Sequence, residues 1–207
     1  MSLALPALDE LRQASRPLAL CLAFEPTRKR PLLADLLLFL LEMERAICLP
    51  SENLLMQIRL QWWADGLASA HQDSAPLLDR LQLWQQDNQL AAPDRAGQIG
   101  KLADWLAIWQ QAVLEEGRPA DALPDLWGRY FFWLAGVGGY PQEAASADLI
   151  GQQLARILQN GQRKQEVSEL VCHSPFMKAC RYLAGSSSAR LASPLLPLRL
   201  FGRMLVS

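Results

Sequence analysis

Residues 32–41, with the sequence LLADLLLFLL, decide the fold class of this chain. Nine of these ten residues are apolar, and Asp35 is the exception. The run is too short to span a bilayer, and its Leu-rich composition favours helix over strand. Pro31 stands at the favoured first position of a helix, and Pro50 ends it. The stretch therefore predicts a buried core helix over residues 31–48.

The composition extends this prediction to the whole chain. The 207 residues include 41 Leu but only 11 Ile and Val together and a single Thr, Thr27, whereas strands favour β-branched residues. We therefore expect an all-α fold, a single-domain helical bundle over residues 1–207. Short connections favour antiparallel neighbours, in particular helices 31–48 and 51–71. Further helices are expected at 6–16, 76–88, 94–117, 121–137, 143–160, 164–171 and 175–184, before an apolar tail at 194–206.

Charge and cysteine content exclude some classes of protein. The chain has 20 basic and 21 acidic residues, and this balance argues against nucleic-acid binding. Its four cysteines form no Cys-x-x-Cys pair, so we expect reduced thiols, no metal site and a cytoplasmic location. The N-terminus lacks the basic region of a signal peptide. Peripheral contact with the inner membrane stays open.

A second stretch, residues 58–67 with the sequence IRLQWWADGL, lies on the helix expected at 51–71. Helical spacing predicts a buried arc and leaves Trp63 half exposed on its flank. Arg59 falls within this arc, and Glu42 lies on the apolar face of the preceding helix, so we predict a buried Glu42–Arg59 pair. That pair could simply fix the packing, or it could form the polar floor of a cavity. The predicted arc consists of Leu54, Leu55, Ile58, Trp62 and Gly66.

Residues 36–45, LLLFLLEMER, and residues 58–67 together resemble the squalene/phytoene synthase family. The similarity is closest to the branch that includes the mitochondrial complex I assembly factor and its proteobacterial relatives. It is clear over residues 18–70, weaker over 125–160 and faint over 194–205. The resemblance implies a shortened helical bundle of the isoprenoid synthase type. It also implies a cavity lined by Phe39, Trp62, Tyr130 and Trp133, with Glu42, Glu44, Arg45, Arg59 and Asp65 as candidate polar residues.

The chain departs from the family at the residues that would hold metal. Active members are similar to other prenyl-diphosphate enzymes in carrying two Asp-rich motifs, which bind Mg²⁺ through hard oxygen ligands. The first motif falls here on Glu44, Arg45 and Cys48, of which only Glu44 suits Mg²⁺. No Asp-x-x-x-Asp run follows Leu126. The resemblance therefore implies a member without catalytic activity and without a cofactor.

Three functions remain open. We expect an assembly or interaction factor for a respiratory complex of the membrane. Its partner would be a subunit of that complex. The alternatives are a Mg²⁺-dependent prenyl-diphosphate transferase and a module that binds a prenyl lipid. The tail at 194–206 is expected to pack on the bundle, with a place on the membrane surface as the alternative.

Overall fold

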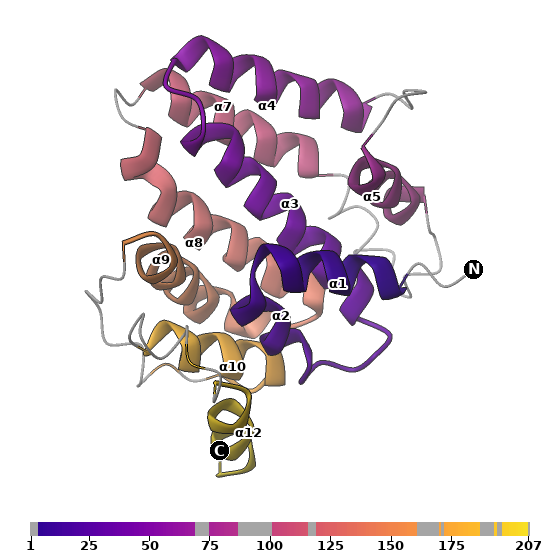
Figure 1. Cartoon of the computed structure of the whole chain (residues 1–207), viewed down its shortest axis with the longest axis vertical. Helices are drawn as coiled ribbons and strands as arrows, with labels where there is room; N and C mark the ends of the chain where they lie inside the picture. The colour runs from indigo at the N-terminus through magenta and orange to yellow at the C-terminus, as the bar shows by residue number, and fades with distance from the viewer. Residues whose placement is uncertain are drawn as a thin grey trace. The chain divides into compact units, whose positions relative to one another are not determined.

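The computed structural model describes residues 4–68, 75–86, 101–115, 119–160, 170, 172–186, 193 and 196–206 (Figure 1). Within these residues the regular structure is helical and contains no strand, which confirms the all-α class. The helices are α1 (Ala4–Ala14), α2 (Arg16–Leu22), α3 (Arg30–Cys48), α4 (Asn53–Ala68), α5 (Pro76–Gln86), α7 (Leu102–Glu115), α8 (Pro119–Gly138), the 3₁₀ helix η1 (Pro141–Glu143), α9 (Ala144–Asn160), α10 (Pro175–Ala184) and α12 (Leu196–Val206).

The chain forms two compact units. Unit 1 comprises residues 35–122, and unit 2 comprises residues 2–34 and 123–207. Unit 1 contains α4, α5, α7 and most of α3, whereas unit 2 contains α1, α2, α9, α10, α12 and most of α8. The expectation of one domain over residues 1–207 stays a prediction.

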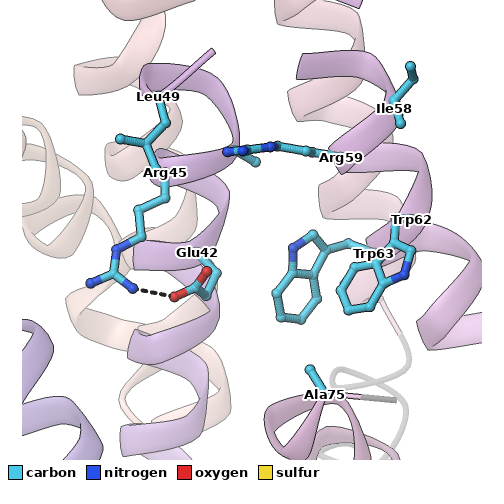
Figure 2. A pocket seen from close by; sticks show the side chains of 9 residues that line it. Glu42, Arg45, Leu49, Ile58, Arg59, Trp62, Trp63 and Ala75 are labelled. Atoms are coloured by element: carbon cyan, nitrogen blue, oxygen red, sulfur yellow. Dashed lines mark hydrogen bonds and ion pairs between the residues drawn. The ribbon is translucent and has the colours of Figure 1, made fainter. Parts of the chain in front are cut away.

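Helix α3 is buried on all its sides over residues 32–40, as a sequence that is apolar except for Asp35 favours. Its bounds confirm the prediction made from Pro31 and Pro50. Phe39 of α3 meets the ring of Trp63 of α4 edge-on, with 5.7 Å between centroids. Figure 2 shows the two helices side by side and running in opposite directions, which confirms the predicted antiparallel pair.

Helix α4 also packs against α5 and α7 within unit 1. Helices α4 and α5 approach closely at Gly66. A Cβ on Gly66 would come within 2.5 Å of a terminal methyl carbon of Leu78, and the Gly66 carbonyl accepts a 2.6 Å hydrogen bond from Gln82. Close approach of the two helices thus explains a glycine inside α4.

The N-terminal region differs from the prediction of one helix over 6–16. The chain forms α1 and α2, interrupted at Ser15, and the second of these helices was not expected. Pro17 accounts for the break, because it has no N–H to continue the hydrogen bonds of α1 but fits the first turn of a new helix.

Unit 2 is organised around α8, α9 and α10. Helix α8 ends as predicted at a glycine pair, where Gly139 adopts a positive φ of 84°. A Cβ on Gly151 of α9 would lie 2.5 Å from the carbonyl oxygen of Trp127 of α8, so these two helices approach very closely. Helix α10 contacts α2, α9 and α12.

Two predicted helices lie partly outside the described residues. Of the helix expected at 164–171, only Leu170 is described, and it is not helical. Of the helix expected at 94–117, residues 94–100, 116 and 117 are not described, and α7 covers residues 102–115.

Candidate functional site

The solvent face of α4 is apolar, and this makes it the first candidate for a binding surface. Leu54 is 64% exposed and Trp62 48% exposed, and Leu55 and Ile58 are exposed with them. These four residues, which we call the α4 face, were predicted to be buried, and that prediction was wrong. The buried residues of α4 are Met56, Leu60, Trp63 and Leu67, together with Gly66, the one member of the predicted arc that is buried.

The correction has a simple physical reason. Helix α4 carries large apolar side chains on both sides, so periodicity alone could not select the side that packs. Packing selects Trp63, which is 7% exposed and meets Phe39 of α3, whereas the prediction left Trp63 half exposed. Trp62 contacts the edge of Trp63, at 5.3 Å between centroids, and otherwise faces outward.

Beside the α4 face lies an open pocket of about 620 Å³. Figure 2 shows that α3 forms one wall and α4 the other, and that Arg59 extends from α4 across the pocket towards α3. Most of the lining is apolar, with charged groups from both helices. The lining residues are Glu42, Arg45, Ala46, Leu49, Ile58, Arg59, Trp62, Trp63 and Ala75.

The predicted buried Glu42–Arg59 pair does not form. The carboxylate of Glu42 forms an ion pair with the guanidinium of Arg45, which lies one turn further along α3, at an N–O distance of 2.6 Å. Arg59 is exposed, and no described residue forms a hydrogen bond or ion pair with it. A partner on the same helix is closer at hand than one on a neighbouring helix, because residues three apart share a helix face. Within the part of the chain that the structure describes, the pocket therefore contains one neutralised charge pair, Glu42–Arg45, and the unpaired guanidinium of Arg59.

Two of the predicted polar residues do not line this pocket. Asp65 is exposed and accepts a 2.8 Å hydrogen bond from Gln61. Glu44 lies close to Cys48, and burial together with the charge of Glu44 raises the pKa of the Cys48 thiol. The neutral thiol of Cys48 is thus favoured over the thiolate, and sulfur is in either form a soft ligand that does not suit Mg²⁺.

The four residues that were predicted to line one aromatic cavity belong to two different units. Of its four residues, Trp62 lines the pocket and Phe39 is buried in the core of unit 1. Tyr130 and Trp133 belong to unit 2, where their rings lie 5.1 Å apart. Burial raises the pKa of Tyr130 well above its usual value. A cavity shared by all four stays a prediction.

Sequence analysis missed a buried ion pair in unit 1. Asp35 of α3 accepts a 2.7 Å bond from the guanidinium of Arg80 and a 2.8 Å hydrogen bond from the indole N–H of Trp84, both on α5. Asp35 and Arg80 are both buried. The sequence does indicate that Asp35 needs a partner, because this carboxylate interrupts an apolar run. It does not indicate that the partner lies on α5.

A second set of buried charges, also missed, holds the start of α10 in unit 2. Glu143 accepts hydrogen bonds from the backbone N–H groups of His173 and Ser174, at 2.8 and 2.7 Å. Glu25 accepts from the backbone N–H of Phe176 at 3.1 Å. Carboxylates at a helix N-terminus satisfy its free N–H groups and its dipole. Glu143 and Glu25 therefore hold the start of α10 in its packed position.

Glu25 also belongs to a chain of hydrogen bonds with Tyr140 and Lys29. The Tyr140 hydroxyl donates to Glu25 at 2.7 Å, and Lys29 donates to that hydroxyl and to the Gly138 carbonyl, each at 2.8 Å. Lys29, in the loop between α2 and α3, therefore helps to hold the end of α8 in unit 2.

Comparisons with models of protein families, with curated proteins and with solved structures found no match to this chain. Among the described residues, no group of three or more His, Cys, Asp or Glu side chains is placed to hold a metal ion. In the same part of the chain, no helix is both long enough and apolar enough to cross a membrane.

Proposed function

We propose that this chain is a non-catalytic protein of the squalene/phytoene synthase type that binds a partner protein through the α4 face. Its role would be that of an assembly or interaction factor for a respiratory complex of the membrane. The observation that carries the proposal is the exposure of Leu54, Leu55, Ile58 and Trp62 on one helix. The family, and with it the kind of complex, rests on the resemblance of residues 36–45 and 58–67.

An exposed apolar surface of this kind is typical of an interaction site. Contiguous apolar side chains on a protein surface cost free energy unless another molecule covers them. Trp and Arg are the residue types that contribute most often to interface hot spots, and Trp62 and Arg59 lie together at the pocket. The partner that fits would present an apolar helix face with a carboxylate opposite Arg59.

The charges at the pocket favour binding over prenyl transfer. Family members that transfer prenyl groups use carboxylates to gather Mg²⁺, whereas here the guanidinium of Arg45 is paired with Glu42. A cation at that position repels a metal ion, and the thiol of Cys48 is unsuited to Mg²⁺. Glu44 is then the one hard ligand at the three positions that correspond to the first motif.

Site-specific photo-crosslinking in the cells that make the protein tests the proposal. A photoreactive residue at position 55 or 62 should form a product with one and the same partner, a subunit of a membrane complex. The same residue at Ala103, an exposed position on α7, serves as the matched control and should not. Arg59→Glu should abolish the product from position 55. Equal products from all three positions would overturn the proposal.

A prenyl-lipid binding function is the second candidate, favoured by the position of Arg59 beside the apolar pocket. An apolar chain could lie along Ile58 and Trp62 while its anionic end meets the guanidinium. Calorimetric titration with farnesyl diphosphate, with and without Mg²⁺, separates the candidates. Binding without Mg²⁺ that Arg59→Glu removes favours the lipid module. Mg²⁺-dependent turnover that Glu44→Gln abolishes would instead support the transferase.

A further inference from the structure

Helix α12 has two apolar faces with different surroundings. Leu196 and Leu200, one turn apart, are buried, and α12 contacts α10 (Figure 1). This confirms that the tail packs on other helices. Leu198 is 69% exposed and Phe201 58% exposed, and helical spacing places these two on one face. Arg199 is exposed next to Leu198. One face of α12 is therefore covered and the other presents two large apolar groups, while Arg199 lies at the side between these faces, because adjacent residues of a helix are turned about 100° from one another.

The charge of the C-terminal region is strongly one-sided. Residues 171–207 contain no Asp or Glu. The first 170 residues carry 15 basic and 21 acidic side chains, so the positive charge of a nearly neutral protein is concentrated at this end. The five basic residues of this region are Lys178, Arg181, Arg190, Arg199 and Arg203.

We propose that α12 docks the chain onto the surface of an anionic lipid bilayer, with Leu198 and Phe201 inserted between the head groups and Arg199 paired with lipid phosphates. Apolar side chains and a basic residue on a short helix without acidic residues are typical of an interfacial anchor. A bilayer with anionic head groups complements both features at once, because basic residues near its surface gain attraction and apolar ones gain burial. The proposal rests on α12 alone, so its test is independent of the test of the α4 face.

Binding of the full-length protein to vesicles tests this proposal. Co-sedimentation with vesicles of phosphatidylcholine containing about one third phosphatidylglycerol should exceed that with pure phosphatidylcholine roughly tenfold or more. About 0.5 M salt should remove most of the difference, because it screens charge attraction. Absence of binding to the anionic vesicles, or equal binding to both kinds, would overturn the proposal and favour a protein partner for this face.

Matched variants assign the binding to α12. Phe201→Ser should weaken binding to the anionic vesicles about tenfold, since it removes one inserted aromatic group. Phe132→Ser on α8 is the control, because Phe132 is 52% exposed and belongs to the same unit. Arg199→Glu should reduce the preference for anionic lipid. Circular dichroism verifies that each variant keeps its helices, and equal loss in both Phe variants would contradict the assignment to α12.

Discussion

Asp35 is a buried carboxylate in the most apolar helix of the chain, and its bonds to Arg80 and Trp84 make that position tolerable. A buried charge without a partner is very costly, whereas a paired and hydrogen-bonded one is close to neutral in net free energy. The pair joins α3 to α5. Its main effect is thus to specify where α5 docks, because α5 in another place would leave Asp35 unpaired.

Arg80→Met should therefore lower the free energy of unfolding by about 3–5 kcal/mol, since it leaves the Asp35 charge buried without its cation. Urea denaturation followed by circular dichroism measures the change. Arg12→Met, which breaks the exposed Asp9–Arg12 pair, is the control and should cost less than about 1 kcal/mol. A double variant, Asp35→Leu with Arg80→Met, should recover most of the loss. Equal costs for Arg80→Met and Arg12→Met would contradict this account.

The sequence indicated which residues needed partners better than it indicated the partners. Asp35 and Glu42 both stand out on an apolar helix, and Arg59 stands out on the next one. Glu42 pairs within its own helix, and Asp35 pairs with a residue 45 positions away. Choosing among several arginines requires the positions of the helices, and residue spacing along the chain does not contain that information.

At the scale of the element, α4 shows what hydrophobic periodicity can predict and what it cannot. The existence of α4 and its neighbour α3 followed from apolar spacing and from the residues around Pro50. The side of α4 that packs did not follow, because Leu54, Ile58 and Trp62 are as apolar as the buried residues on its other side. A helix that is apolar all round is normally buried all round, so the exposed side of α4 is the part of this site that needed a structure.

Two adjacent tryptophans make a direct test of this assignment. Trp63→Ala should lower the free energy of unfolding by about 3–5 kcal/mol, because it removes a buried ring that packs on Phe39. Trp62→Ala should cost about 1 kcal/mol, because Trp62 is half exposed. Thermal or urea unfolding of the two variants gives the comparison. The reverse order would restore the predicted arc of Leu54, Leu55, Ile58, Trp62 and Gly66 as the packed side.

Two glycines give a second test of how helices approach one another. Gly151→Ala should destabilise by about 1–3 kcal/mol, because its Cβ would meet the backbone carbonyl of Trp127, which cannot move without shifting α8. Gly66→Ala should be close to neutral, because its Cβ would meet the flexible end of Leu78 and alanine favours helix. Unfolding midpoints of the two variants measure the contrast. A stabilised Gly151→Ala protein would show that α8 and α9 lie further apart.

At the scale of the whole molecule, composition predicted the helical class because Leu-rich sequences with few β-branched residues have no good alternative. The two compact units were not predicted. Helices α3 and α8 each contribute residues to both units, so the division falls inside helices instead of in a Gly- or Pro-rich linker. The usual compositional signals are therefore of little use here: Asp35 lies in an apolar helix, and the prolines near Ala122, Pro119 and Pro124, lie within α8 instead of in a linker.

Unit 2 holds several groups that keep their protons more tightly when the protein is folded. Burial raises the pKa of Cys172 to about 11 from an ordinary value of 9.0. Burial likewise raises the pKa of Tyr130 and of Cys180, and for Cys180 the nearby Cys21 adds to the effect. These groups lose their protons in the unfolded chain first, so a rise in pH stabilises the unfolded state relative to the folded one and lowers the free energy of unfolding.

These groups should therefore leave the free energy of unfolding unchanged below about pH 8 and should lower it as pH rises from about 9 towards 11. Each group can contribute a decrease of up to about 1.4 kcal/mol per pH unit. Urea midpoints measured every half unit between pH 7 and 11 test this. In Cys172→Ala the whole curve shifts by the cost of the lost packing, but its decline above pH 9 should be shallower than in the unaltered protein. The difference arises because one proton-holding group is gone, while Tyr130 and Cys180 remain. Curves that run parallel over the whole range would show that Cys172 gives up its proton as readily in the folded chain as in the unfolded one.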